Sequence, residues 1–273
     1  MRYKKDTYKQ NKTQQSHCKN FYFIFGNEGI ILISDGKGGY TIPVAENMPE
    51  ELIAERDVMH AGNLDGLEVY CYRTKIKPND STVFSEYPLR QSYNVLDHKL
   101  YLMAGKCAEL LYFNDNTMFC GRCGGQMEKS TDISKKCIKC GNEVWPQLST
   151  AVIVLIRKGD EALLVHSKNF KRKYYGLVAG FVETGETLEE AVKREAMEET
   201  GLTINNLQYF GSQPWPYPCG LMIGFTADYE SGEIKIQEEE LAEASWFRKD
   251  SLPLIPEKLS IARQLIDNWR GEL

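Results

Sequence analysis

The sequence has 273 residues, of which 42% are hydrophobic and 26% are charged, the usual balance of a globular protein. A net charge of −5 gives no overall positive field that would draw the chain to nucleic acid or to a membrane. The longest apolar run, 151–156, is far shorter than the roughly 20 residues of a transmembrane helix. The first residues contain no apolar stretch typical of a secretory signal, so we expect a cytoplasmic protein.

The N-terminal part reads as a small α+β domain over residues 1–113, and the sequence assigns it no chemical role. Residues 1–17 form a basic, polar tail that we expect to be solvated. The runs 21–25 and 29–34 predict strands, and the glycine-rich segment 36–40 predicts a turn rather than a phosphate loop. Helical apolar spacing extends over 95–112.

Four of the eight cysteines lie close together, in two Cys-x2-Cys pairs that are each followed by glycine. These are Cys120, Cys123, Cys137 and Cys140. Two such turns supply four thiolates to one tetrahedral ion, which predicts a structural zinc ribbon over residues 114–147. Its modest excess of basic residues leaves nucleic-acid binding as an alternative role, but folding and positioning is the simpler one. The remaining cysteines (Cys18, Cys71, Cys107 and Cys219) are scattered, and we expect free thiols.

From residue 148 the pattern indicates a third domain, 148–273. The runs 150–156 and 161–166 predict buried strands, a helix is predicted over 187–200, and strands are predicted near 207–210 and 221–227. An amphipathic helix closes the chain, with one apolar stripe. The stripe consists of Leu259, Ala262, Ile266 and Trp269.

The helix predicted over 187–200 places carboxylates where apolar residues are expected. Its apolar stripe continues, one and two turns later, as Glu195, Glu198 and Glu199. Arg194 could pair with Glu190 and Glu198 at four-residue spacing, which would leave the other two unpaired. An ordinary solvated charged face would lie away from the stripe, whereas a hard divalent cation, Mg²⁺ or Mn²⁺, would neutralise such a cluster.

The surrounding segment resembles the sequence box of the Nudix hydrolases, G-x5-E-x7-R-E-U-x-E-E-x-G-U, where U is a bulky aliphatic residue. The matching residues are Gly180, Glu186, Arg194, Glu195, Glu198, Glu199, Gly201 and Leu202. Ala196 departs from the pattern, because it stands where the first bulky aliphatic residue is usual. The resemblance implies an α/β/α sandwich with a mixed sheet, and hydrolysis of a nucleoside diphosphate linked to another group.

The resemblance also implies roles for single residues. Glu195, Glu198 and Glu199 would hold the catalytic Mg²⁺ or Mn²⁺, Arg194 would orient them, and Glu186 would support the box loop or a metal-bound water. In relatives of this type a further glutamate joins the metal shell, and Glu240 occupies the matching place. The alternative for Glu240 is a solvated acidic turn.

A proline–aromatic segment, SQPWPYP, spans residues 212–218, between two predicted strands. Its prolines favour extended backbone, which would place Trp215 and Tyr217 on one side. A proline-rich ligand motif is the alternative interpretation. The segment resembles the S-Q-P-W-P-F-P-x-S array of the NADH pyrophosphatase branch of the Nudix family. Here Tyr217 replaces the usual Phe and Gly220 replaces the final Ser.

This branch implies hydrolysis of NADH or NAD⁺ to nicotinamide mononucleotide and AMP, and in bacterial members the removal of NAD caps from RNA 5′ ends. By the same resemblance, Phe181 would stack on the nicotinamide ring, Gln213 would line the pocket, and Trp145 would be supplied by the partner of a homodimer. Each of the three could instead be ordinary packing. Two alternatives stay open: a Nudix hydrolase for another compound such as ADP-ribose, and an inactive domain that senses a nucleotide.

Overall fold

The computed structural model describes residues 19–55, 57–77, 83–169 and 174–272. The basic tail predicted over 1–17 therefore lies outside the described residues. The chain divides into two compact units, with the division between Cys107 and Ala108. Among the described helices, none is long and apolar enough to cross a bilayer.

The first unit is built on a seven-stranded sheet with the order β3-β2-β1-β6-β5, on which β4 pairs with β1 and β7 pairs with β2. The strands are β1 (Asn20–Phe25), β2 (Ile30–Ser34), β3 (Tyr40–Thr41), β4 (Val44–Ala45), β5 (Met59–Leu64), β6 (Leu67–Arg73) and β7 (Phe84–Tyr87). Only the β1–β6 pair is parallel among the pairs described. The predicted strands at 21–25 and 29–34 are confirmed as β1 and β2.

Three helical segments accompany this sheet: η1 (Glu50–Leu52), α1 (Leu89–Ser92) and α2 (His98–Asn116). The helix predicted over 95–112 begins three residues later than expected and ends four residues later. Asp97 sets its start, because the Asp97 carboxylate accepts the Lys99 amide at 2.9 Å, as a residue before a helix does. The division between the units falls inside α2.

The cysteine-rich segment forms a small antiparallel sheet with the order β10-β9-β8. Its strands are β8 (Met127–Thr131), β9 (Ser134–Cys137) and β10 (Glu143–Val144). Two turns have the same hydrogen bond, one before β8, where the Gly124 amide donates to the carbonyl of Cys120, and one between β9 and β10, where the Gly141 amide donates to that of Cys137. Both glycines have a left-handed backbone, with φ 69° for Gly124 and 72° for Gly141, which explains why glycine follows each cysteine pair.

The C-terminal domain is a mixed six-stranded sheet with the order β14-β15-β11-β12-β16, on which β13 pairs with β11. Its strands are β11 (Ser149–Lys158), β12 (Glu161–Ser167), β13 (Val178–Phe181), β14 (Thr203–Trp215), β15 (Gly220–Ser231) and β16 (Leu241–Arg248). The β11–β15 pair is parallel, and the other described pairs are antiparallel. This arrangement confirms the mixed sheet that the sequence predicts.

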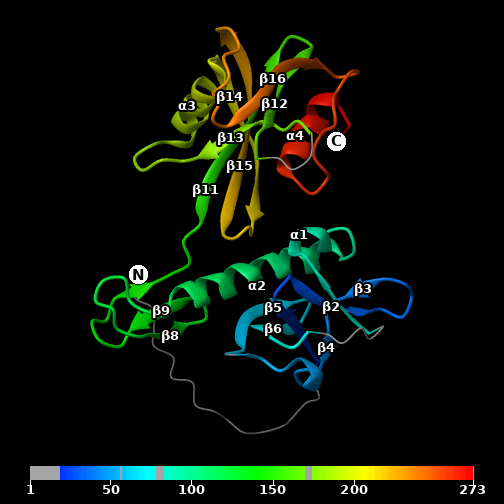
Figure 1. The fold of residues 1–273 in the computed structure, drawn as a ribbon, viewed down its shortest axis with the longest axis vertical. Coiled ribbons are helices and arrows are strands. Elements are labelled where there is room, and N and C mark those ends of the chain that lie inside the picture. Colours follow the sequence, from blue (N-terminus) through cyan, green and yellow to red (C-terminus); the bar gives the residue numbers. More distant parts are fainter. Residues whose placement is uncertain (1–18, 56, 78–82, 170–173, 273) are drawn as a thin grey trace. The chain divides into compact units, whose positions relative to one another are not determined.

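Helices cover both faces of this sheet, α3 (Leu188–Thr200) on one side and α4 (Ile261–Arg270) on the other (Figure 1). Strand β11 shows why: Val152 and Val154 belong to the core cluster that contains Ala191 of α3. Ile153 and Leu155 belong to the cluster that contains Leu265 of α4. Alternate side chains of a strand point to opposite faces, so the apolar run is buried from both sides. The α/β/α sandwich is confirmed.

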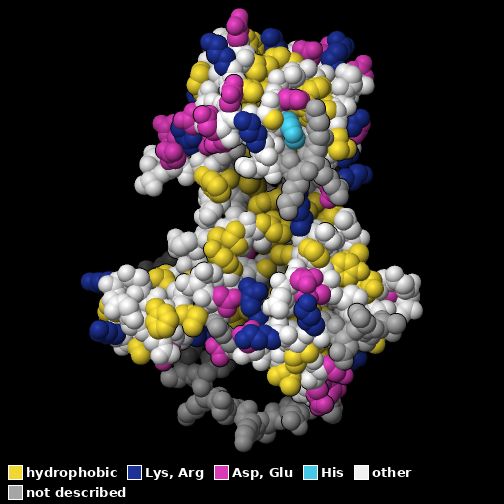
Figure 2. Space-filling view, viewed as in Figure 1, with side chains coloured by type: hydrophobic (Ala, Val, Ile, Leu, Met, Phe, Trp, Pro, Cys, Tyr) yellow, Lys and Arg dark blue, Asp and Glu magenta, His cyan; other side chains and the backbone are white. Residues whose placement is uncertain are grey.

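Helix α3 begins and ends where its sequence dictates. Thr187 and Glu190 form a reciprocal capping box at the N-terminus, and Gly201, with φ 71°, ends the helix in the left-handed conformation. The predicted helix is thereby confirmed. Acidic side chains gather on the surface over α3 (Figure 2).

The position predicted for the proline–aromatic segment between two strands is wrong for its first half. β14 continues through Ser212 to Trp215, and Pro214 pairs with Leu221 of β15. The strand tolerates this proline because β14 lies at the edge of the sheet. On its open side there is no neighbouring strand, so the missing amide donor costs no hydrogen bond there.

Candidate functional site

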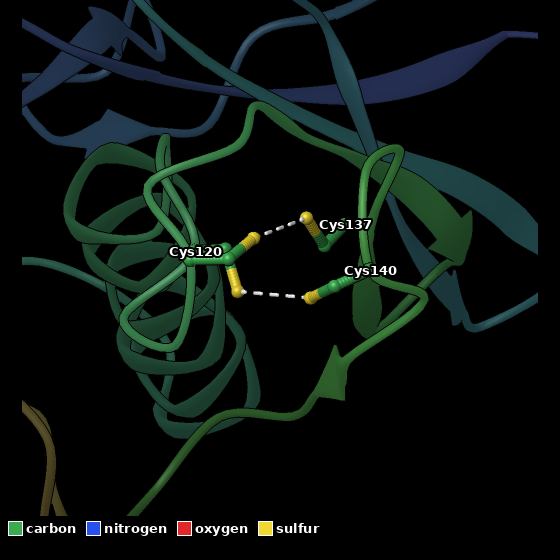
Figure 3. Close-up of side chains that lie close together, drawn as sticks. Cys120, Cys137 and Cys140 are labelled. Carbon is green, nitrogen blue, oxygen red and sulfur yellow. Dashed lines mark hydrogen bonds between the residues drawn. The ribbon is translucent and has the colours of Figure 1, made fainter.

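The four clustered cysteines come together in space as the spacing predicts. Their sulfurs all lie within 4.8 Å of one another, which among the described residues is the one group of potential metal ligands gathered so closely. Cys120 and Cys140 approach to 3.7 Å, and Cys123 and Cys137 to 3.5 Å (Figure 3). The backbone amide of Cys140 is the largest of the causes that lower the pKa of Cys137, to about 6. Four soft thiolates at one point fit a closed, tetrahedral metal site.

Two of the three helix carboxylates follow the apolar stripe into the domain. Glu195 and Glu199 on α3 are only 8% and 4% exposed, whereas the Glu198 side chain is 53% exposed. Burial is the chief cause that raises the pKa of both buried carboxyls, that of Glu199 to about 8. The neighbouring charge of Glu240 raises both pKa values further. Two buried carboxylates under mutual repulsion form a site that a divalent cation would stabilise.

Arg194 is the centre of the charged network on α3. Its guanidinium contacts Glu186 through Nε at 2.5 Å and through Nη2 at 2.9 Å, and it reaches Glu195 at 2.8 Å and Glu198 at 3.0 Å. Arg194 is the largest cause that lowers the pKa of Glu186, to about 2. Glu186 also accepts the Glu183 amide at 2.9 Å, which ties the loop before α3 to the same arginine.

The ion pairs expected from helical spacing are therefore partly wrong. Arg194 binds Glu198 but not Glu190, because the Glu190 carboxylate is occupied by the backbone amide and hydroxyl of Thr187 in the capping box. Glu195, which the sequence left unpaired, accepts from Arg194. Local capping thus outcompetes one i, i+4 pair at the start of the helix.

Gly180 packs directly against the buried carboxylate of Glu195. A Cβ added at Gly180 would lie 2.0 Å from Glu195 Oε1, closer than any real contact. Glycine at this position is therefore a steric requirement of the Glu195 carboxylate. This close approach explains physically why a glycine stands fifteen residues before the glutamate.

Glu240 lies on an exposed turn that precedes β16. It is close enough to act electrostatically on both Glu195 and Glu199. Within the described residues, however, no set of three or more carboxylates gathers its oxygens as closely as the cysteines gather their sulfurs. Arg194 accounts for part of this spread, since it holds Glu195 and Glu198 by hydrogen bonds.

An aromatic cleft of about 310 Å³ lies beside this carboxylate cluster. Its lining residues come from β11, β13, the end of β14, the start of β15 and the turn between these two strands, and most are apolar or glycine. They include Gly180, Phe181, Trp215, Tyr217, Cys219 and Gly220. The rings of Trp215 and Tyr217 meet edge to face with centroids 5.1 Å apart, and Phe181 is 66% exposed. Three aromatic side chains thus surround a space that suits a flat ring.

Two other residues singled out from the sequence lie elsewhere. The Gln213 amide is occupied by backbone at the start of α4, where it donates to Leu259 O and accepts from Ile261 N, both at 2.7 Å. Gln213 is not among the residues that line the cleft. Trp145 follows β10 and is 49% exposed.

The structure adds cleft residues that the sequence did not indicate. Ser149, Ala151 and Met222 line the cleft because β11 pairs in parallel with β15, which sets Ala151 opposite Met222. Nothing in a single sequence specifies this register, because the two strands are about 70 positions apart in the chain.

Comparison with known proteins agrees with this site. A family model described as NUDIX domain matches residues 146–269. The NAD-capped RNA hydrolase NudC of Shigella dysenteriae is 45% identical over 174 residues, which cover 63% of this chain and 68% of that protein. NudC of Pseudomonas aeruginosa is 41% identical over 217 residues, covering 79% of this chain and 77% of that protein.

Among solved structures, a Nudix hydrolase from Nitrosomonas europaea superposes with a TM-score of 0.49 at 21% identity, covering 56% of this chain and 90% of that chain. The sequence relatives are the stronger finding, because their identity is high over most of their length. On the strength of these relatives, the chain belongs to the Nudix family, in the branch whose members are named NAD-capped RNA hydrolases.

Proposed function

We propose that this protein hydrolyses the diphosphate linkage of NADH or NAD⁺ to nicotinamide mononucleotide and AMP, and that it removes NAD caps from RNA 5′ ends. In this reaction one water molecule adds to a phosphorus atom, the bridging P–O bond breaks, and two phosphate monoesters form, with release of two protons when both products are dianions. The relatives named NAD-capped RNA hydrolase support the substrate class.

One observation carries the proposal: the aromatic cleft and the carboxylate cluster share Gly180. This residue lines the cleft, and its backbone lies against the Glu195 carboxylate on the other side. A flat ring held by Phe181 in the cleft would keep its attached diphosphate near the carboxylates. Fixing the scissile bond beside the reacting groups is a major source of rate enhancement.

The carboxylate cluster fits a hard divalent cation, Mg²⁺ or Mn²⁺. Its donors are oxygens only, and burial raises the pKa of Glu195 and Glu199, so their ionised forms need a compensating positive charge. Glu195, Glu198, Glu199 and Glu240 would hold the cation. When bound, such a cation screens the charge of the diphosphate and lowers the pKa of a water molecule.

The protein's own residues would hold the reacting groups and the substrate in place at this site. Arg194 holds Glu186, Glu195 and Glu198 at fixed positions, and it also binds the carbonyl of Phe181. Phe181 presents an exposed ring for stacking, and Trp215 and Tyr217, whose rings contact each other, line the same cleft. The aromatic walls would also exclude water from one side of the substrate.

We further propose zinc as the ion of the four cysteines, with a structural role, because four thiolates leave no open position for chemistry. A homodimer in the cytoplasm, with Trp145 contributed to the partner's site, would agree with the exposure of that side chain. The three-domain organisation, 1–113, 114–147 and 148–273, belongs to the same proposal.

A matched assay tests the proposal. Zinc-loaded protein would receive NADH, NAD⁺, ADP-ribose and 5′-NAD-capped RNA in parallel, with Mg²⁺ or Mn²⁺, and products would be identified by mass. We expect nicotinamide mononucleotide from NADH and from capped RNA at higher kcat/KM than any cleavage of ADP-ribose. Faster turnover of ADP-ribose would reassign the substrate. No cleavage of any of the four by folded protein would support an inactive nucleotide-binding domain instead.

A further inference from the structure

The turn that carries Glu240 is attached on one side to α3 by backbone alone. The amide of Gln237 donates to the carbonyl of Glu199 at 3.0 Å, and the amide of Glu240 closes the turn on Gln237 O at 3.0 Å. The buried carboxylate residue Glu199 and the turn are therefore linked through one intervening residue. These bonds fix where the turn begins.

On its other side, the same turn is held by the end of β12. The Lys168 amide donates to the carbonyl of Glu240 at 2.9 Å, and the Ser167 hydroxyl donates to the same oxygen at 3.3 Å. The Lys168 ammonium group reaches further along the turn and donates to the carbonyl of Glu238. Lys168 thus contacts the turn with both its backbone and its side chain.

Glu240 needs such a support because its exposed surroundings supply little packing to hold its side chain. The residue is exposed, and it follows Glu238 and Glu239, so three like charges stand in succession on one turn. Packing does not fix an exposed side chain, and adjacent carboxylates repel one another. An ammonium group bound at Glu238 offsets part of this repulsion and limits the freedom of the turn.

We propose that Lys168 is a positioning residue for Glu240. Its hydrogen bonds hold the turn 238–240 in place, so that the Glu240 carboxylate stays directed toward the cation site. This inference rests on the proposed function, in which Glu240 contributes to holding Mg²⁺ or Mn²⁺. Lys168 is about 70 positions from the turn in sequence, and it belongs to neither the Nudix box nor the proline–aromatic segment.

Direct Mn²⁺ binding to the zinc-loaded full chain tests the role, with free Mn²⁺ measured by electron paramagnetic resonance and without reliance on turnover. We expect Lys168→Met to weaken Mn²⁺ binding by about fivefold, which corresponds to the net contribution of one ordinary hydrogen bond. Lys168→Arg, which keeps the charge and donors, should stay within about twofold of the unaltered protein. Lys158→Met removes an equal charge at the end of β11, where Lys158 pairs with Glu161 at the start of β12, and should leave Mn²⁺ affinity unchanged.

A double-mutant cycle separates positioning from general stabilisation. If Lys168 acts through Glu240, Lys168→Met should cause no further loss of Mn²⁺ affinity in the Glu240→Gln background. A full additional loss in that background, or unaltered Mn²⁺ affinity in Lys168→Met alone, overturns the inference. Unaltered affinity in Glu240→Gln overturns both this inference and the cation role of Glu240. Weakening by Glu240→Gln but not by Lys168→Met overturns the inference alone. Thermal unfolding of each variant checks that it is folded.

Discussion

Arg194 joins the aromatic cleft to the carboxylate cluster, because its Nη2 donates to the carbonyl of Phe181 at 2.9 Å while its Nη1 donates to Glu195 at 2.8 Å. The guanidinium is a rigid fork, so the distance between the two partners is set by one planar group. The position of the ring in the cleft and the position of a buried carboxylate are thereby coupled.

This coupling predicts the effect of Arg194→Lys. Lysine keeps the positive charge but cannot bind Phe181, Glu186 and Glu195 together, so we expect kcat/KM for NADH to fall by about 100-fold. Both kcat and KM should change, because the ring and the carboxylates lose their common support. Steady-state kinetics checks this, with the exposed neighbour Lys193→Gln as the control. Normal kinetics in Arg194→Lys would contradict the coupling.

Phe181→Ala should weaken substrate binding without affecting stability. The ring is 66% exposed, so its removal leaves no cavity, and the melting temperature should stay within about 1 °C. Loss of one stacking partner should raise KM for NADH by roughly tenfold. Tyr209→Ala is the control, since its ring is 63% exposed but does not line the cleft. Equal changes in KM for the two variants would argue against stacking by Phe181.

Gly180→Ala should inactivate the enzyme through Glu195. The added methyl group would lie 2.0 Å from Glu195 Oε1, so the carboxylate must move, and a displacement of this kind costs about 100-fold in kcat/KM. Gly211→Ala is the matched control, because a Cβ there meets no atom within 4 Å. Kinetics at saturating Mg²⁺ compares the two. An active Gly180→Ala variant would show that the close approach is unimportant.

The raised pKa of Glu199 predicts a pH-dependent stability. Burial raises this pKa from its ordinary 4.5 to about 8, so in buffer without Mg²⁺ or Mn²⁺ the folded protein holds a proton that the unfolded chain has released. Stability should therefore fall as the pH rises from 4.5 through 8. Glu199→Gln cannot ionise, and it should become more stable than the unaltered protein by about 2–4 kcal/mol at pH 9, but not at pH 5.

Urea unfolding at the two pH values measures this difference. Glu198→Gln serves as the control, because it makes the same chemical change at a side chain on the same helix that is 53% exposed. If Glu199→Gln were more stable than the unaltered protein by the same amount at both pH values, burial would not shift the pKa of the Glu199 carboxyl.

Cys137→Ser should release the metal of the ribbon. Structural zinc contributes folding free energy directly, so we expect metal content to fall from about one ion per chain toward zero. Hydrogen exchange should then lose protection in β8, β9 and β10. Elemental analysis and exchange mass spectrometry measure the two effects. Cys219→Ser, which removes a cysteine outside the cluster, should keep the metal. Retained protection in metal-free protein would contradict the structural role.

Features that depend on near neighbours in the chain could be predicted from the amino-acid sequence alone. The two Cys-x2-Cys turns need only a few residues and a glycine with left-handed backbone, and their sulfurs meet as expected. Helix α3 could also be predicted, because its ends are specified locally by Thr187, Glu190 and Gly201. The continuous apolar run of β11 predicted a buried strand, and the structure buries this strand between two cores.

Features that depend on partners far apart in the chain became visible only in the folded domain. Helical spacing could not show that Glu190 would cap the helix while Arg194 turned to Glu186 and Phe181. It also could not show that Gln213 would bind the start of α4, or that Lys168 would reach Glu238. A short motif fixes which side chains lie on one face of an element. Which of several possible hydrogen bonds forms depends on strand register and packing, and these arise only when the whole domain has folded.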